Sequence, residues 1–434
     1  MAPRRAAPLG PAYRESVLWH EGVERVRPPA GPLPTEADVV VVGGGYCGLM
    51  AAAELARRGR HVVVLEADEL GIGGASTRNG GMVIPELKYG PRALTRKYGP
   101  LGREMAESVF EACALVERLV DEHAIACDYL QCGGLLLAHH DAQVAGLREA
   151  EREWVDDLGR SAHFVDRGEL HEEIGSSEYV AGLVMDDVAG IQPAKYHAGL
   201  VRLAFDAGAD VHDRTGAEVL ERRARGGWRV ATTRGVVLAK DVLVATNAYI
   251  DGLVPPLGRR VLPIGSYIIA TGVLDEDVAR TLIPRGRMVF DTRNLLAYWR
   301  LSPDRRMVFG GRTSLAPMSV PSARDRLYRE MVRIHPQLAG TTLDFAWGGQ
   351  VAITFDRMPH FGRVNGLAYA TGCNGTGIAL ATWFGARAAA WIADEEPPPP
   401  FAHLEFPRIP LNFLRGAYLP VVGQWFRAMD RFGR

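Results

Sequence analysis

The 434-residue sequence has few cysteines and lacks any long uncharged apolar run. Its five cysteines are odd in number and form no C-x-x-C pair, which argues against a disulfide framework. No apolar run reaches the ~18 residues of a membrane span, and no apolar segment follows the arginine pair near the N-terminus as in an export signal. The formal net charge of -1 provides no overall attraction for nucleic acid. We therefore expect a cytoplasmic protein without a transmembrane segment or a nucleic-acid partner.

A dinucleotide-binding pattern begins at Asp38. The continuous apolar run "DVVVVG" predicts a parallel strand that is covered on both faces. It leads into Gly43, Gly45 and Gly48 in G-x-G-x-x-G spacing, which permits a tight turn, close approach of a pyrophosphate and close packing of helix on strand. Glu66 ends the next apolar run, where a carboxylate can accept both ribose hydroxyls and disfavours the 2′-phosphate of NADP.

Two further glycine-rich segments favour FAD over NAD. The loop "GIGGASTRNGGM" is rich in backbone donors and can pass beside phosphates and a flat ring. The segment "ATGCNGTGIAL" leads a predicted strand into a helix that starts near Thr376, and a helix N-terminus aimed at the isoalloxazine would stabilise reduced flavin. "GCNGTG" lacks the spacing of a second nucleotide site, and the first loop lacks the cysteine pair of a disulfide reductase. The alternative for each segment is a turn that only supports the fold.

These motifs resemble the D-amino-acid oxidase superfamily of FAD-dependent amine oxidoreductases, in particular its glycine oxidase, sarcosine oxidase and γ-glutamylputrescine oxidase branch. The likeness covers most of the chain from about residue 36 and includes "SYIIAT", "MVFGGR", "DRMPHFGRV" and the tail "IPLNFLRGAYLPVVGQWFR". Many relatives have an aromatic residue where Cys373 stands and a histidine where Thr376 stands. A covalent flavin thioether at Cys373 is the alternative to non-covalent FAD, which we expect because nothing nearby requires the covalent bond.

The resemblance implies an α/β fold with a Rossmann-like FAD-binding domain of the glutathione-reductase-2 type and an inserted antiparallel-sheet substrate domain. We expect the FAD-binding domain in residues 36–90, 186–255 and 345–396, and the substrate-binding domain in residues 91–185 and 256–344. Residues 1–35 should form an N-terminal arm, and residues 397–434 a tail packed on the FAD domain.

The residues expected to contact FAD come from several separate segments. They are Gly43, Gly45, Tyr46, Cys47, Gly48, Glu66, Ala67, Gly74, Ala75, Ser76, Arg78, Asn79, Gly80, Gly81, Val219, Thr246, Asn247, Gly372, Asn374, Gly375, Thr376 and Gly377. The hydroxyls of Ser76 and Thr77 could reach the phosphates or only satisfy the loop's own backbone. His139, His140 and His197 lack partners at metal-ligand spacing, so no metal is expected.

The resemblance implies oxidation of a C–N bond in a small amine or amino acid. A hydride passes from the α-carbon to flavin N5, the imine hydrolyses, and O₂ (giving H₂O₂) or another acceptor reoxidises the flavin. No general base is obligatory because the cofactor does the electron chemistry, so the catalytic residue stays unassigned. The candidates for the substrate side are Tyr267, Tyr298, Trp299, Arg300, Arg312 and His360. Either of the two arginines could hold a substrate carboxylate through paired hydrogen bonds, although Tyr298 and Arg300 share a strand face that could instead be solvated.

Two other functions would keep the same glycine motifs. One is a flavin-binding or assembly protein without turnover, and the other is a flavoenzyme that acts on a non-amine substrate, such as a modified tRNA base. The near-neutral net charge argues against the tRNA substrate. The sequence does not specify the amine, the electron acceptor or the oligomeric state.

Overall fold

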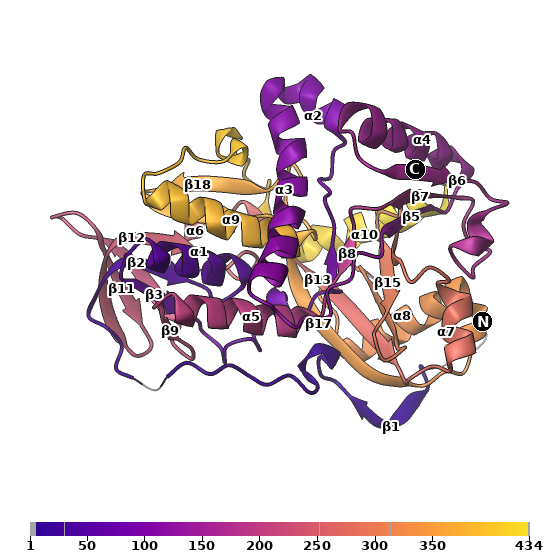
Figure 1. The fold of residues 1–434 in the computed structure, drawn as a ribbon, viewed down its shortest axis with the longest axis horizontal. Coiled ribbons are helices and arrows are strands. Elements are labelled where there is room, and N and C mark those ends of the chain that lie inside the picture. The colour runs from indigo at the N-terminus through magenta and orange to yellow at the C-terminus, as the bar shows by residue number, and fades with distance from the viewer. Residues whose placement is uncertain (1–5, 30, 251, 313, 433–434) are drawn as a thin grey trace.

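The computed structural model describes residues 6–29, 31–250, 252–312 and 314–432. Two lobes lie side by side, each built on one large β-sheet with helices packed against it (Figure 1). The predicted α/β fold class is confirmed, because a parallel strand–helix–strand unit of Rossmann type forms the centre of the first lobe.

The first lobe is built on the predicted dinucleotide-binding pattern. Its sheet has the order β10-β11-β12-β2-β3-β9, and β19 and β18 extend it beside β12. These strands are β2 (Glu36–Val42), β3 (Val62–Leu65), β9 (Asp210–His212), β10 (Ala217–Arg222), β11 (Trp228–Thr232), β12 (Gly235–Val244), β18 (His360–Val364) and β19 (Leu367–Thr371). Val39 and Val41 of β2 pack in the helical core, while Val40 and Val42 pack in a second core on the other face. Burial on both faces explains why this strand is continuously apolar.

Four helices form the main core of the first lobe. They are α1 (Tyr46–Arg57), α3 (Pro100–Glu122), α5 (Pro193–Asp206) and α9 (Gly377–Ile392). α1 packs against α5 and α9, and α9 packs against α3. Two glycines allow this close approach, because a Cβ at Gly48 would collide with the carbonyl oxygen of Gly43, and one at Gly385 with that of Cys47. α1 is therefore fixed directly against both its strand and α9.

The second lobe contains a nine-stranded sheet in the order β1-β17-β13-β16-β15-β14-β5-β7-β6. These strands are β1 (Leu9–Arg14), β5 (Gly134–Ala138), β6 (Ala162–Val165), β7 (Ala181–Met185), β13 (Val261–Thr271), β14 (Met288–Asp291), β15 (Ala297–Leu301), β16 (Met307–Gly311) and β17 (Leu343–Thr354). Neighbouring strands are antiparallel except at the pairs β1–β17 and β14–β5. A helix, α8 (Val320–Ile334), packs against β13, β16 and β17. A separate two-stranded sheet joins β4 (Met82–Val83) to β8 (Ala189–Gly190).

The remaining helical segments lie between these elements or at the ends of the chain. They are the helices α2 (Pro91–Tyr98), α4 (Val144–Arg152), α6 (Pro255–Gly258), α7 (Glu276–Leu282) and α10 (Arg415–Arg431), and the short segments η1 (Leu18–His20), η2 (Ala75–Thr77), η3 (Asp141–Gln143), η4 (Glu153–Asp157), η5 (Leu170–Glu172), η6 (Pro336–Leu338), η7 (Pro400–His403) and η8 (Asn412–Leu414). None of the helices within the described ranges combines the length and the apolar character needed to cross a lipid bilayer.

The segments that strand pairing and helix packing place in each lobe differ from the predicted domain boundaries. β17 lies wholly in the second sheet, because it pairs with β13 along nearly its whole length. The sequence predicts instead that residues from 345 onward belong to the FAD-binding domain. α3 packs in the first-lobe core, although its residues fall in the predicted substrate segment 91–185. The described part of the N-terminal arm contributes β1, which pairs in parallel with β17.

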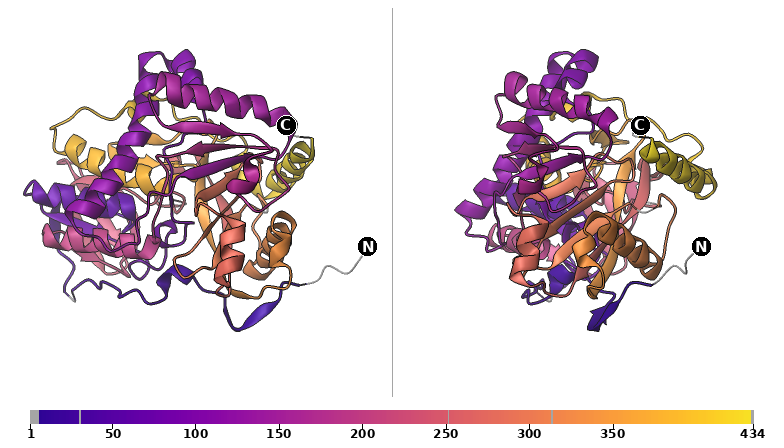
Figure 2. Two further views of the ribbon diagram at one scale, coloured as in Figure 1. Left: turned by 45° about the vertical axis from the view of Figure 1, so that its right-hand side comes forward. Right: turned by 90° about the vertical axis from the view of Figure 1, so that its right-hand side faces the viewer.

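The C-terminal tail packs on both lobes. Phe401 is fully buried against Trp383 and Phe384 of α9 in the first lobe. α10 instead bonds to the second lobe, where the Asp430 carboxylate accepts the backbone N–H of Asn294 at 2.8 Å and the Asp430 carbonyl oxygen lies 2.9 Å from Nε2 of His139. Figure 2 shows this helix at the periphery of the molecule.

Candidate active site

A cavity of about 680 Å³ lies where the two lobes meet, and residues of both lobes line it. The first lobe contributes the turn after β2, the end of β3 and the start of α9. The second contributes side chains of β13 and β15, including Ser266 and Tyr298. The walls therefore combine glycine-rich backbone on one side with polar and charged side chains on the other.

Most of the predicted cofactor-contacting residues are brought together at this cavity. Those that line it are Gly43, Gly45, Tyr46, Cys47, Glu66, Ala67, Gly74, Ala75, Ser76, Arg78, Asn79, Gly80, Thr246, Asn247, Asn374, Gly375, Thr376 and Gly377. Segments that are hundreds of residues apart in the chain therefore meet around one space. Their convergence follows from the pairing of β12 with both β2 and β19, which aligns the ends of these three parallel strands.

Four predicted contact residues lie outside the cavity lining. Gly48 faces Gly43, and Gly81 lies against the carbonyl oxygen of Ile191. Gly372 is packed against Thr354. Val219 is 44% exposed on β10, whereas Ala217 lines the cavity. A register shift separates these two β10 residues, so the regular alternation of the strand is interrupted between them.

The N-terminus of α1 forms one end of the cavity. Gly45 is the N-cap residue, and no side chain caps the helix there. The N–H groups of a first helical turn have no partner within the helix, and together with the helix dipole they favour an anion. Ser76 lies beside this turn, because its Oγ accepts the N–H of Tyr46 at 3.1 Å. A Cβ at Gly45 would lie 2.9 Å from the Oγ of Ser76, so the absence of a side chain keeps this end of the cavity open.

Glu66 presents a carboxylate to the cavity beside that turn. It accepts the N–H groups of Gly44 at 2.8 Å and Asp68 at 3.0 Å. Burial raises the pKa of Glu66, although the backbone donors oppose this effect. A carboxylate fixed in this way retains lone pairs for hydroxyl donors of a ligand.

Arg312 and Tyr298 form the opposite wall. The Nη2 of Arg312 donates to the carbonyl oxygen of Asn374 at 3.2 Å, and within the described part of the chain no carboxylate forms a salt bridge with Arg312. Burial lowers the pKa of Arg312. The hydroxyl of Tyr298 lies 3.2 Å from that of Ser266, and burial raises the pKa of Tyr298, which keeps the phenol neutral near pH 7. A buried cation without an acidic partner is expensive, so this wall suits an anionic ligand.

The segment after β4 supplies further cavity residues that the sequence analysis missed. Met82, Ile84, Glu86 and Lys88 all line the cavity, and their two-residue spacing in "MVIPELK" is the signal that could have identified them. Lys88 lies 3.8 Å from Glu86. The Glu86 carboxylate acts to raise the pKa of Lys88. Burial and two nearby arginines together outweigh this effect, so the pKa of Lys88 is lowered.

These two arginines are Arg312 and Arg357, and both line the cavity. Together with Lys88 they form what we call the cationic cluster. The carboxylate of Glu86 neutralises only one of the three positive charges of the cationic cluster. The cluster therefore leaves this part of the cavity with excess positive charge.

Four of the candidate substrate residues are engaged elsewhere. Arg300 shares the inward face of β15 with Tyr298, but it is buried and donates to the carbonyl oxygens of Gly81 and Ile191 at 3.0 and 2.9 Å. His360 lies 3.1 Å from the carboxylate of Asp356. The candidates Tyr267 and Trp299 point into the second-lobe core, where the Tyr267 hydroxyl donates to the carbonyl oxygen of Met318 at 2.7 Å. The partners of Arg300 and Tyr267 come from distant segments that the sequence does not reveal, whereas His360 pairs with a residue only four positions away.

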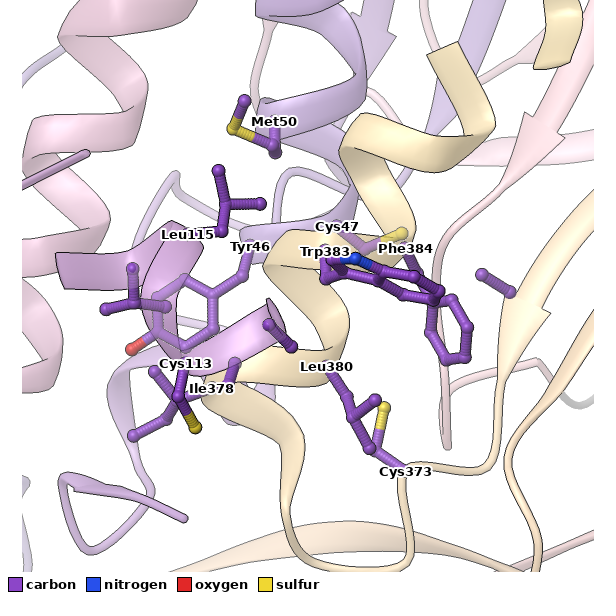
Figure 3. Packing of buried hydrophobic residues seen from close by; sticks show 14 of the residues in the cluster. Tyr46, Cys47, Met50, Cys113, Leu115, Cys373, Ile378, Leu380, Trp383 and Phe384 are labelled. Carbon is purple, nitrogen blue, oxygen red and sulfur yellow. The ribbon is translucent and has the colours of Figure 1, made fainter. Parts of the chain in front are cut away.

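Two cysteines also line the cavity. Figure 3 shows Cys47 on α1 and Cys373 before α9, within the packed core of these helices. Burial raises the pKa of the Cys373 thiol to about 12 and raises that of Cys47 as well. Both thiols are therefore protonated near pH 7 and poorly nucleophilic.

Several cavity atoms fit a ligand that offers both phosphates and hydrogen-bonding ring atoms. The Oγ1 of Thr246 is buried and has no hydrogen-bond partner in the described ranges of the chain. A Cβ at Gly74 would meet no atom within 4 Å, so the backbone there opens onto free space. In the described part of the chain no group of three or more His, Cys, Asp or Glu side chains is arranged to hold a metal ion. The residues present thus fit the expected FAD.

Comparisons with known proteins identify the family and similar folds. The family described as FAD dependent oxidoreductase (DAO) matches residues 38–391. The chain is 32% identical over 393 residues to gamma-glutamylputrescine oxidoreductase of Escherichia coli K12, covering 88% of this chain and 91% of that protein. It is 27% identical over 389 residues to glycine oxidase of Pseudomonas aeruginosa, covering 84% and 98%. Glycine oxidase from Geobacillus kaustophilus has a similar fold, with a TM-score of 0.72 at 21% identity, covering 86% of this chain and 99% of that one.

Proposed function

This chain belongs to the DAO family of FAD-dependent oxidoreductases, and from that premise we propose that it oxidises the C–N bond of an amine that also carries a carboxylate. The observation that supports this substrate is the cationic cluster in the same cavity as the glycine-rich turns. Glycine and γ-glutamylputrescine, for which two relatives are named, are both amines with a carboxylate. A cluster of buried cations binds that group through charge-assisted hydrogen bonds.

The first-lobe residues are proposed to hold FAD. The first turn of α1, with Ser76 beside it, would bind the pyrophosphate, and Glu66 would accept the ribose hydroxyls. The start of α9 would lie at the flavin ring and favour negative charge there. When bound, FAD accepts the two electrons and the hydrogen that leave the carbon next to the amine nitrogen.

The second-lobe wall is proposed to orient the substrate. Arg312 would pair with the carboxylate, because its guanidinium has no acidic partner among the described residues. Lys88 would add a second positive charge while Glu86 limits the excess. Tyr298, as a neutral phenol, would hydrogen-bond to the substrate without taking up a proton. Water then hydrolyses the imine product to a carbonyl compound and an amine, and O₂ or another acceptor completes the cycle.

Anaerobic mixing of the yellow protein with a panel of compounds tests the function. We expect amines with a carboxylate to bleach the flavin band, and amines without one to do so more slowly. Bleaching by a non-amine compound alone would identify a different flavoenzyme. Formation of a sulfite adduct and photoreduction, without reduction by any compound, would identify a flavin-binding protein without turnover.

Non-covalent attachment of FAD is part of the same proposal. The protonated thiol of Cys373 is a poor nucleophile, which supports it. Acid precipitation should therefore release all the flavin into the supernatant, and a yellow pellet would show a covalent bond. We also propose that the protein works in the cytoplasm, because its five cysteines are free.

Replacement of Glu66 by glutamine should weaken FAD binding by about tenfold. The amide has a similar size, but it loses the charge and one of the two oxygens that serve the backbone donors of Gly44 and Asp68. Titration of apoprotein with FAD, followed by flavin fluorescence, measures the change. Glu54→Gln, in an ion pair with Arg57 on the outer side of α1, is the matched control and should bind as the wild type does. An unchanged Kd for Glu66→Gln would remove Glu66 from the site.

A further inference from the structure

Two tryptophans hold consecutive carbonyl groups of the loop that follows η2. The indole N–H of Trp347 donates to the carbonyl oxygen of Arg78 at 2.8 Å. The indole N–H of Trp19 donates to the carbonyl oxygen of the next residue, Asn79, at 2.7 Å. Indole nitrogens can only donate, so each of these bonds fixes the direction of one carbonyl.

The orientation of the carbonyls determines where the amide hydrogens point. The described peptide bonds are all trans, and in a trans peptide the N–H points opposite to the C=O. The carbonyls of Arg78 and Asn79 are drawn toward the tryptophans, so the N–H groups of Asn79 and Gly80 point the other way. Asn79 and Gly80 both line the cavity, and no partner for either N–H exists within the described residues. These are two fixed, unused donors at the cavity wall.

The two indoles come from opposite ends of the chain. Trp347 belongs to β17, whereas Trp19 lies in η1 of the N-terminal arm, before the dinucleotide-binding pattern begins. Trp19 is only 3% exposed, and its own carbonyl oxygen accepts the side-chain amide of Gln192 at 2.7 Å. The two rings meet edge to face with centroids 6.3 Å apart. The described part of the arm therefore packs behind the loop that follows η2 and supports this part of the cavity wall.

We propose that Trp19 and Trp347 are positioning residues of the cofactor site, which they prepare by turning the N–H groups of Asn79 and Gly80 into the cavity. This inference rests on the proposed binding of FAD, whose ring carbonyl and nitrogen acceptors suit such donors. It makes the described part of the N-terminal arm a support of the cofactor site, although none of its residues 6–29 and 31–35 lines the cavity. The donors are set before the cofactor arrives, so binding does not have to order the loop.

The test replaces each tryptophan by phenylalanine, which keeps an aromatic ring and removes the N–H. Apoproteins of Trp19→Phe and Trp347→Phe are titrated with FAD by flavin fluorescence, and their melting temperatures are measured without FAD. We expect Kd to rise about tenfold in each variant, the effect of one hydrogen bond, with little change in the apoprotein melting temperature. The rise in Kd for the double variant should be smaller than the product of the two single rises, because both hydrogen bonds fix the same loop.

Two other buried tryptophans provide matched controls. The indole nitrogens of Trp228 and Trp299 are buried and have no hydrogen-bond partner among the residues that the structure describes, and neither residue is among the described residues of the cavity lining. Trp228→Phe and Trp299→Phe should therefore bind FAD as the wild type does. Wild-type affinity in Trp19→Phe, or an equal loss in all the variants, would overturn the inference. A wild-type protein that does not bind FAD at all would instead overturn the proposed function.

Discussion

Gly45→Val should purify as a colourless protein. The valine Cβ would lie 2.9 Å from the Oγ of Ser76, and its methyl groups would occupy the space in front of the first turn of α1. That space is where the pyrophosphate is proposed to bind, so the substitution removes room for the cofactor and also disturbs the bond from Tyr46 to Ser76. We expect FAD affinity to fall by at least about 1,000-fold, which corresponds to about 4 kcal/mol.

The measurement is the visible absorbance of the purified protein, before and after incubation with excess FAD. Gly45→Ala provides a graded variant, because its single methyl group meets only the serine oxygen. Gly146→Ala is the control, since a Cβ at this exposed position of α4 would meet no atom within 4 Å. A fully yellow Gly45→Val protein would show that the phosphates bind elsewhere.

Arg312→Met should lower kcat/KM by about 100-fold for amines that carry a carboxylate. The substitution keeps an unbranched side chain but removes a buried positive charge that no acidic side chain of the described residues neutralises. A substrate carboxylate would then be desolvated without its strongest partner. For an amine without a carboxylate the loss should be much smaller, so the ratio of the two kcat/KM values isolates the role of Arg312 as a substrate anchor.

Arg312→Lys should recover part of the activity, because it keeps the charge but cannot form two parallel hydrogen bonds. Arg363→Met serves as the control, since Arg363 pairs with Asp241 away from the cavity and should leave both rates unchanged. The flavin spectrum of each variant verifies that cofactor is bound. Equal losses for substrates with and without a carboxylate would contradict the proposed anchor.

The tertiary structure corrected the candidates on the substrate side more than those on the cofactor side. Arg300 lies on β15 and Arg312 directly follows β16 of the same sheet, and the two arginines have the same character in the sequence. Arg300 donates to backbone carbonyls just before β4 and before α5, while Arg312 donates to a carbonyl in the turn before α9, beside the cavity. Which arginine faces the substrate depends on these distant partners, and a single sequence does not list them.

The cofactor side could be predicted because its geometry is local. Gly43, Gly45, Gly48 and Glu66 belong to one strand–helix–strand unit, and their spacing alone places them at one end of two parallel strands. β10 shows the limit of this reasoning, because Ala217 lines the cavity although only Val219 was expected there, and a register shift separates the two residues.

By itself the sequence determined the cofactor, the family and the fold class, since glycine spacing and apolar runs act through neighbours along the chain. Only the tertiary structure decided which charges remain unpaired in the cavity and that an N-terminal tryptophan supports the wall of the proposed cofactor site. The physical reason is that a buried polar group is defined by its partner, and these partners, Trp19 with Asn79 and Arg312 with Asn374, are brought together only by strand pairing between distant segments.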